Sequence, residues 1–275
     1  MFATVNFIYP PENFFGKIKY NLLPPPIKVQ RISVPEGSDF LRADVPVIRG
    51  KIYWSNVYSN IGKAGQNLLL PKNANFKEFG ELRRFKSERF YRQLCINSSI
   101  KLLSLLPKMR LPYEVSVIDF PAVCVPLLES LPGLCRSVKI ITYREEKYAP
   151  LKQKAMEEYG CAIITTPDIS RAFTSPVIIM PDGSDKAVAF SRGSYIFSPF
   201  SDNIYSSNVF TMNGVSLAQK YLDLLPTGIE TSEFAAALYE QSEVQALKSS
   251  ICSSFKQGNI IRSYKDIAKA LSEDL

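Results

Sequence analysis

The sequence predicts an α/β protein whose core is a mostly parallel β-sheet, and three observations support this. From about residue 113, short apolar runs alternate with helical patterns, and runs that are apolar on both faces are typical of buried parallel strands. Hydrophobic residues make up 46% of the 275-residue chain and charged residues 21%, a balance that permits a large core and argues against disorder. No run of about 18 apolar residues occurs, so the sequence predicts no transmembrane helix.

Residues 1–110 are expected to form an N-terminal β-rich segment followed by a long helix. Paired and tripled prolines interrupt the apolar segments 4–9 and 27–34, which fits edge strands better than helices. Apolar residues at helical spacing then predict one helix over residues 77–106, ended by Pro107. The basic side chains of this helix alternate with acidic ones, which is typical of a solvated face, and a phosphate-binding stripe is the alternative.

Residues 111–275 are expected to form the α/β domain, with C-terminal helices packed against it. Apolar runs predict strands over 115–120, 138–143, 161–166, 177–180, 186–190 and 194–198. A helix is expected over 145–159, closed by Gly160. The tail predicts three helices, over 215–225, over 231–255 and from Ser263 onward, the last opening with a pattern close to a capping box.

The strand–helix rhythm of residues 113–200 resembles that of the NAD(P)-binding Rossmann superfamily. The resemblance rests on the runs Val115–Asp119, Val138–Thr142, Cys161–Thr166 and Val177–Met180. It implies a Rossmann-like fold in which ligands bind at the carboxyl ends of the strands. Dehydrogenases, methyltransferases and non-enzymatic relatives share this rhythm, so it does not decide the function.

The sequence departs from this family at the first turn. Dinucleotide-binding members have G-x-G-x-x-G there, because glycines allow a tight turn and close approach of the backbone to pyrophosphate. Residues 120–126 read Phe-Pro-Ala-Val-Cys-Val-Pro, without glycine and with two prolines that each remove an N–H donor. NAD(P) binding is therefore disfavoured, the glycine-rich loop of S-adenosylmethionine methyltransferases is missing too, and no cofactor is firmly implied.

Polar residues at the predicted strand ends are the candidate ligand-binding residues. They are Asp119, Tyr143, Arg144, Thr165, Thr166, Asp168 and Asp182. By the resemblance, Arg144 stands where family members hold a 2′-phosphate with arginine. The alternative for this set is ordinary capping and turn formation. The residues point to no particular catalytic group and predict no metal site.

The chain contains no histidine, which removes several mechanisms at once. Ser-His-Asp and Cys-His nucleophiles and histidine-based metal sites are excluded, so catalysis would need carboxylates, Lys, Tyr, Cys or a cofactor. The five cysteines include no CxxC pair and predict neither a disulfide framework nor a zinc site. With no basic leader pattern at the N-terminus, the expected location is cytoplasmic.

Three functional hypotheses follow, in this order. The first is a non-catalytic ligand-binding or regulatory module, whose partner is an unidentified small molecule or protein. The second is an NAD(P)- or S-adenosylmethionine-dependent enzyme with an atypical cofactor site. The third is binding of nucleic acid or an anionic surface through the basic helix 77–106. It ranks last because the formal charge of +7 is modest and no run of five basic residues occurs. Whether the chain is an enzyme stays open.

Overall fold

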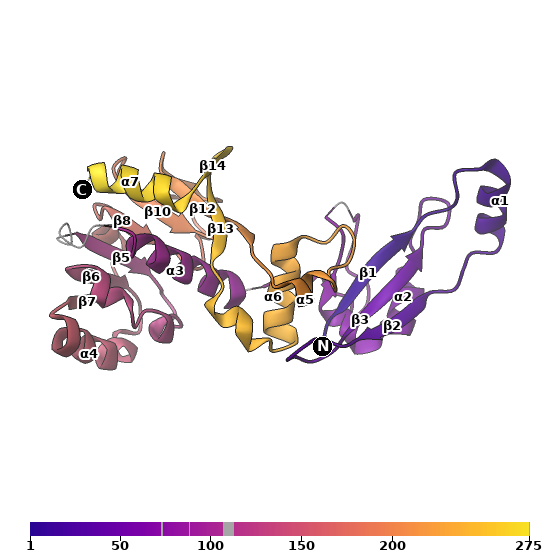
Figure 1. The fold of residues 1–275 in the computed structure, drawn as a ribbon, viewed down its shortest axis with the longest axis horizontal. Helices are drawn as coiled ribbons and strands as arrows, with labels where there is room; N and C mark the ends of the chain where they lie inside the picture. The colour runs from indigo at the N-terminus through magenta and orange to yellow at the C-terminus, as the bar shows by residue number, and fades with distance from the viewer. Residues whose placement is uncertain (73, 88, 107–112, 275) are drawn as a thin grey trace. The chain divides into compact units, whose positions relative to one another are not determined.

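The computed structural model describes residues 1–72, 74–87, 89–106 and 113–274, and the chain divides into two compact units. Unit 1 comprises Met1–Ser87 and Leu217–Lys248, and unit 2 comprises Glu88–Ser216 and Ser249–Leu275. The chain therefore leaves unit 1, builds most of unit 2, returns to unit 1 and ends in unit 2 (Figure 1). This division differs from the boundary expected near residue 110.

Unit 1 is built on a four-stranded sheet with the strand order β2-β3-β1-β4. β1 pairs in parallel with β3 and β4, and β2 is antiparallel to β3. The β-rich N-terminal segment predicted from the sequence is thus confirmed. The elements are β1 Ala3–Ile8, α1 Phe14–Leu22, β2 Lys28–Ile32, β3 Phe40–Pro46, α2 Trp54–Ile61, the 3-10 helix η1 Gly62–Gln66, β4 Leu68–Leu69, α5 Gln219–Leu222, α6 Thr231–Gln241 and the 3-10 helix η7 Gln245–Ser249.

An aromatic cluster packs residues 217–248 against the N-terminal part of unit 1. The ring of Phe2 stacks on that of Phe40 at a centroid distance of 4.8 Å, and Phe234 of α6 meets Phe40 edge-on at 5.7 Å. All three side chains are fully buried. A second cluster, which includes Val45 and Val57, packs between the sheet and α2. Unit 1 thus buries apolar residues from chain segments about 200 positions apart, which a boundary near residue 110 could not provide.

The predicted helix over residues 77–106 is wrong in its first third, because α3 spans only Arg89–Leu103. Residues before it pair with β4 instead: the N–H of Leu68 donates to Arg83 and that of Phe85 donates to Leu68. Leu82, directly before Arg83, is buried in the core of unit 1. This tertiary pairing outweighs the local helical spacing. The basic side chains of the predicted helix, for which a phosphate-binding stripe was the alternative, are divided as a result, with Arg83 in unit 1 and Arg92 in unit 2.

Unit 2 is built on an eight-stranded sheet with the order β14-β13-β12-β10-β8-β5-β6-β7. Its parallel part, numbered from β5 along the chain, runs 3-2-1-4-5-6, which is the strand order of the Rossmann fold. The Rossmann-like α/β prediction is therefore confirmed. The strands are β5 Glu114–Ile118, β6 Ser137–Ile141, β7 Ala162–Thr166, β8 Val177–Ile179, β10 Tyr195–Ser198, β12 Val209–Val215, β13 Cys252–Gln257 and β14 Ile260–Arg262.

Helices cover this sheet unevenly. α3 contacts α7 and four strands from β8 to β13, whereas α4 lies beside β7 (Figure 1). The connections on either side of β10, residues 180–194 and 199–208, are fully described by the structure and contain no helix. Their short strands β9, Val188–Ala189, and β11, Ile204–Tyr205, pair with each other in parallel. The helices of unit 2 are α3, η3 Val125–Leu127, η4 Leu131–Leu134, η5 Glu145–Tyr148, α4 Ala149–Tyr159, η6 Ile169–Ala172 and α7 Tyr264–Asp274.

The C-terminal helices differ from the prediction in two places. The helix expected over 215–225 is reduced to α5, since Val215 still belongs to β12. The helix expected over 231–255 ends at Gln241, and β13 follows, antiparallel to β12. Buried Cys252 and Phe255 are spaced three apart, which fits a helix as well as this strand. The last helix is confirmed as α7, preceded by a Ser263–Asp266 capping pair.

Gly160 closes α4 in the left-handed conformation, with φ at 62°. We expect Gly160→Ala to destabilise the protein by roughly 1–2 kcal/mol, because a Cβ is unfavourable at positive φ. Urea unfolding would measure this change. Gly193→Ala is the control, since Gly193 also faces open space but has no positive φ. Its free energy of unfolding should change by less than about 1 kcal/mol, and an equal loss in both variants would contradict the interpretation.

Candidate functional site

The candidate site is a cavity of about 780 Å³ at the carboxyl ends of β5, β6 and β8. Ile118 ends β5, Tyr143 follows β6 and Met180 follows β8, and all three line the cavity. The strand order reverses between β5 and β8. Open α/β sheets bind ligands at this switch point, because the connections from the two strands diverge there and leave a crevice.

The walls of the cavity are mostly apolar and aromatic. Phe120 and Tyr143 stack with their ring centroids 4.7 Å apart and their planes 21° apart. Ile169 and Phe173, from η6 and the residue after it, form a second wall. Tyr143 is 70% exposed, so most of its surface is free for a ligand to contact.

One end of the cavity is polar. Asp182, Ser184, Asp185 and Lys186, from the connection after β8, line it together with Val188 of β9. The missing helix after β8 therefore has a structural consequence, because the segment in its place brings charged side chains to the cavity. A ligand there would meet aromatic rings on one side and charged groups on the other.

The first turn is held by a buried carboxylate. Asp119, directly after β5, is 1% exposed and accepts hydrogen bonds from the N–H groups of Val123 (3.1 Å) and Cys124 (2.8 Å). The hydroxyl of Tyr148 donates to the same carboxylate. Ala122 adopts a φ of 55° within this turn, a conformation that favours glycine. The amides of Val123 and Cys124 are thus already bonded within the protein.

Burial also determines the protonation of the groups around Asp119. Burial raises the pKa of the Cys124 thiol well above its ordinary value, and the negative charge of Asp119 adds to the effect. Burial and the hydrogen bond to Asp119 raise the pKa of Tyr148 likewise. Both groups therefore keep their protons at neutral pH, and Cys124 is a poor nucleophile there because thiolate is the reactive form.

Arg92 of α3 reaches Asp182 at the polar end of the cavity, with Nε 2.7 Å from Oδ1. The Arg92 side chain is only 17% exposed. Burial lowers the pKa of Arg92, but the hydrogen bond and charge of Asp182 outweigh it and raise the pKa overall. The pair fixes the Asp182 side chain at the end of the cavity and keeps a positive charge close by.

The structure brings only part of the predicted set to the cavity. Tyr143 and Asp182 line it, and Asp119 lies at the end of β5 with its carboxylate engaged in the first turn. Arg144 follows Tyr143 and is exposed, outside the cavity lining.

The three residues predicted after the third strand have local partners instead. The Thr165 hydroxyl donates to Glu145 and accepts from Lys152, each at 2.6 Å. Thr166 accepts from the N–H of Asp168, which in turn caps η6 by accepting from the N–H of Ser170. Hydrogen bonds from Ser170 lower the pKa of Asp168. Thr166 and Asp168 thus have the turn and capping geometry that was the alternative to ligand binding.

Several cavity residues were not predicted from the sequence. Phe120 directly follows Asp119 and Met180 lies two residues before Asp182, and their place after a strand was the signal available. Asp185 and Lys186 fall in a segment that the sequence indicates only as a turn and a strand. Arg92 lies 90 positions from Asp182, so only the folded chain shows that the two side chains meet.

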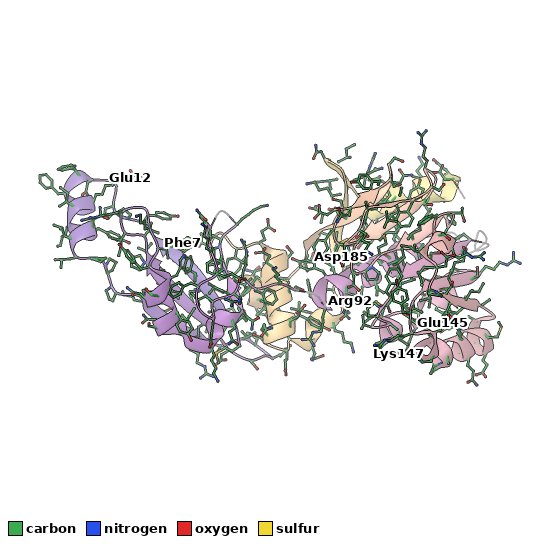
Figure 2. The ribbon with its side chains drawn as sticks, turned by 180° about the vertical axis from the view of Figure 1, so that it is seen from behind. Phe7, Glu12, Arg92, Glu145, Lys147 and Asp185 are labelled. Atoms are coloured by element: carbon green, nitrogen blue, oxygen red, sulfur yellow. The ribbon has the colours of Figure 1, made fainter. Side chains whose placement is uncertain are left out.

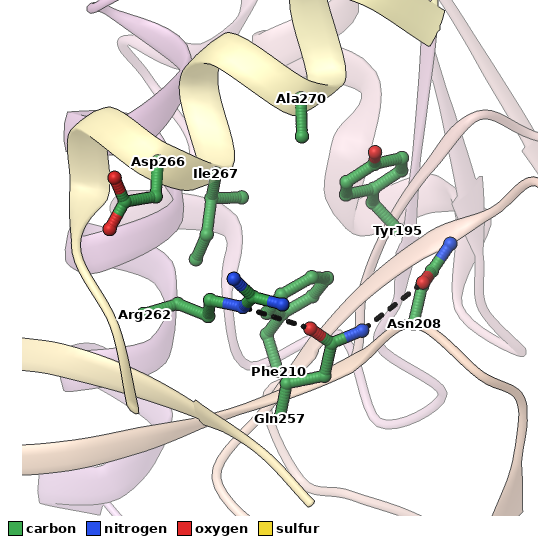
Figure 3. A pocket seen from close by; sticks show the side chains of 8 residues that line it. All are labelled: Tyr195, Asn208, Phe210, Gln257, Arg262, Asp266, Ile267 and Ala270. Atoms are coloured by element: carbon green, nitrogen blue, oxygen red, sulfur yellow. Dashed lines mark hydrogen bonds between the residues drawn. The ribbon is translucent and has the colours of Figure 1, made fainter. Parts of the chain in front are cut away.

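A second cavity of about 230 Å³ lies between α7 and the strands β10 and β12–β14 (Figure 3). Its polar side chains mostly bond one another: Arg262 donates to Gln257, and Gln257 donates to Asn208. Tyr195 also donates its hydroxyl to Asp274 at 2.7 Å. Since these groups already have partners, this cavity offers a ligand less than the one at the switch point.

Among the residues that the structure describes, no cluster of three or more Cys, Asp or Glu side chains is arranged to hold a metal ion. Among the helices that the structure describes, none is long and apolar enough to cross a membrane.

The chain matches no protein-family model and no curated protein sequence. Among solved structures it is similar to Δ1-pyrroline-2-carboxylate reductase from Thermococcus litoralis, in complex with NADH and L-proline. That match has a TM-score of 0.28 and 13% identity, and covers 39% of this chain and only 36% of the other. L-tryptophan dehydrogenase from Nostoc punctiforme matches with a TM-score of 0.35 and 10% identity, over 99% of this chain and 88% of the other. The Rossmann-like fold rests on the strand order described above.

The Asp119 hydrogen bonds can be tested by substitution. We expect Asp119→Ala to lower the free energy of unfolding by about 3 kcal/mol or more, because it leaves buried donors without partners. Tyr148→Phe should cost about 1 kcal/mol, and the double variant should cost less than the sum of the two. Urea unfolding of the four proteins measures the coupling. Asp202→Ala, at an exposed position, is the control, and additive effects at Asp119 and Tyr148 would contradict the interpretation.

Proposed function

We propose that unit 2 is a ligand-binding module whose switch-point cavity takes a small molecule with a planar apolar group. The observation that carries this proposal is the position of the cavity, where the strand order of a Rossmann-like sheet reverses, together with its aromatic walls and polar end. Its volume of about 780 Å³ lies within the range of small-molecule sites.

The aromatic walls favour a planar group over an aliphatic one. Aromatic rings prefer offset-stacked or edge-on neighbours, and the stacked pair of Phe120 and Tyr143 offers both at one wall. The charged groups at the other end suit a ligand with amino or hydroxyl groups, because Asp185 accepts hydrogen bonds and Lys186 donates them. A nucleoside combines a planar ring with hydroxyl groups in this way.

The first turn argues against a diphosphate. A phosphate near the turn would compete with the Asp119 carboxylate for the amides of Val123 and Cys124. Like charges would also repel one another there. We therefore expect an uncharged ligand such as adenosine to bind more tightly than NAD⁺.

We place binding ahead of catalysis because of the titratable groups nearest the first turn. Cys124 and Tyr148 are both buried, and the raised pKa of each keeps it protonated at neutral pH. General bases and nucleophiles work best with a pKa near the operating pH.

The second candidate is an NAD(P)- or S-adenosylmethionine-dependent enzyme that holds its cofactor in an atypical way. The Rossmann strand order and the cavity at the switch point favour it. Arg144 also supports it, because this exposed arginine directly follows Tyr143, which lines the cavity.

Calorimetric titration with adenosine, S-adenosylmethionine, NAD⁺ and NADP⁺ tests the main proposal. We expect adenosine to bind and Tyr143→Ala to weaken its affinity up to about tenfold, since an aromatic pair contributes about 0.5–1.5 kcal/mol. Tyr205→Ala is the matched control, because Tyr205 is 63% exposed and lies outside the cavity lining. The absence of adenosine binding, or an equal loss in both variants, would contradict the proposal.

The second candidate makes a different prediction. If the chain binds NADP⁺, we expect Arg144→Ala to weaken NADP⁺ binding at least tenfold and to leave NAD⁺ binding unchanged, because only NADP⁺ carries the 2′-phosphate. The same titrations measure both affinities, so NAD⁺ serves as the internal control. Equal losses for the two dinucleotides would show that Arg144 does not read the 2′-phosphate.

A further inference from the structure

Two cysteines that lie far apart in the sequence come together at the amino edge of the sheet of unit 2. Cys135 directly follows η4 and stands two residues before β6, and Cys161 directly precedes β7. β6 and β7 pair in parallel, with Ser137 beside Ala162. Adjacent strands lie about 4.8 Å apart, so the positions just before this pair are close neighbours. The strand pairing thus joins two cysteines that no short sequence motif links.

The segments that carry the two cysteines also pack against each other. The ring of Tyr159, at the end of α4, lies so close to Gly133 of η4 that a Cβ at Gly133 would be 3.2 Å from it. The thiols of Cys135 and Cys161 form a hydrogen bond with each other. The two sulfur atoms therefore belong to one cluster, although both cysteines are reduced in this structure.

The hydrogen bond makes the two thiols chemically unequal. Together with burial, it raises the pKa of Cys135, which keeps its proton. The same hydrogen bond lowers the pKa of Cys161; burial opposes this effect, and the N–H of Val138 adds to it. Because the thiolate is the reactive form of cysteine, Cys161 is the nucleophile of the pair and Cys135 is the thiol placed beside it.

The other three cysteines have no such activation. Burial is the main reason that the pKa values of Cys95, Cys124 and Cys252 are raised above the ordinary value. Buried thiols of this kind are inert at neutral pH. Reactivity among the five cysteines is therefore concentrated at Cys161.

The surroundings of the pair favour a small reagent. Cys135 is 7% exposed and Cys161 is 1% exposed, so a bulky disulfide such as oxidised glutathione has poor access to either sulfur. β7 is nevertheless the outermost strand of the sheet, and the flanking residues Arg136 and Gly160 are exposed. The pair thus lies just beneath the surface, where a molecule the size of hydrogen peroxide needs little movement of the chain to enter.

We propose that Cys135 and Cys161 form a redox modification site, at which a peroxide converts the two thiols to a disulfide. With hydrogen peroxide, the Cys161 thiolate attacks one oxygen, the O–O bond breaks, and hydroxide leaves and takes up a proton, which makes Cys161 a sulfenic acid. The sulfur of Cys135 then attacks that of Cys161, the S–O bond breaks and water leaves. The two thiols lose two electrons and two protons in all, and one peroxide becomes two waters.

The disulfide acts on the stability of unit 2. It closes a loop that contains β6, η5 and α4, and such a cross-link stabilises the fold chiefly by restricting the unfolded chain. The candidate ligand site lies at the other, carboxyl edge of the sheet, where Figure 2 labels Arg92 and Asp185. The modification site is therefore separate from the proposed ligand-binding cavity, and its test does not depend on a ligand.

Mass mapping of the full chain after treatment with hydrogen peroxide tests the proposal. Remaining thiols are blocked with iodoacetamide in denaturant, and Cys95, Cys124 and Cys252 serve as internal controls. We expect one disulfide, between Cys135 and Cys161, with the three controls alkylated. The Tm should rise on the order of 5 °C, and dithiothreitol should reverse the rise. The absence of this disulfide, or equal oxidation of the controls, would overturn the proposal.

Two variants separate the two steps of the reaction. With Cys135→Ser, Cys161 should stop at the sulfenic acid, which dimedone traps, whereas with Cys161→Ser the Cys135 thiol should stay reduced. A sulfenic acid on Cys135 instead would contradict the assignment of the nucleophile. In the wild-type protein, whose mapping needs neither variant to fold, oxidised glutathione should react at least tenfold more slowly than hydrogen peroxide. Equal rates for the two oxidants would contradict the assignment of a small peroxide.

Discussion

The hydrogen bonds of the Asp119 carboxylate are the interaction on which the first turn, and with it the site, depends. A Rossmann-like sheet normally follows its first strand with a glycine-rich turn and a helix whose N-terminus holds a phosphate. Here the Asp119 carboxylate stands in place of the phosphate, because it accepts hydrogen bonds from two successive amides of the turn. The turn is therefore already satisfied without a ligand. Two short 3-10 helices replace the usual helix after it.

The same half of unit 2 shows a second departure, in the connections after β8 and β10. They pair as β9 and β11 and carry buried Phe190 and Ile204 onto the apolar cluster that includes Ile118 and Ile178. The sheet face is thus covered without a helix, and the segment before β9 is free to form the polar end of the cavity. The cavity results from these two departures together, since the first turn supplies Phe120 and the β9 segment supplies Asp185.

The sequence predicts the central sheet well and the edges of both units poorly. Strands such as Val177–Ile179 are buried on both faces, so every position is apolar and the run can be recognised from the sequence. Gly160 also ends α4 as its position indicates. The sequence places Leu82 and Phe255 in helices, because an apolar spacing of three fits a helix and a bent or irregular strand alike. Their true pairing depends on partners elsewhere in the chain, which local spacing does not show.

For the candidate site, too, the sequence predicts what depends on local position and misses what depends on the strand order. Tyr143 and Asp182 come directly after strands, and the topology of a parallel sheet brings such positions to one edge. Thr165 and Asp168 satisfy the same rule, yet β7 is the outermost strand and its end lies away from the switch point.

The conformation of Ala122 shows why the glycine-free first turn is a stable alternative to the glycine-rich, phosphate-binding turn, and not merely a weakened form of it. Its positive φ is unfavourable for a residue with a Cβ, by roughly 1–2 kcal/mol. The buried hydrogen bonds to Asp119 offset this strain, since each contributes about 1 kcal/mol or more when the acceptor is charged. A glycine at position 122 would relieve the strain but leave the amides of Val123 and Cys124 bonded to Asp119. Under the proposed function, the carboxylate, rather than the lack of glycine, is therefore what disfavours a diphosphate at this turn.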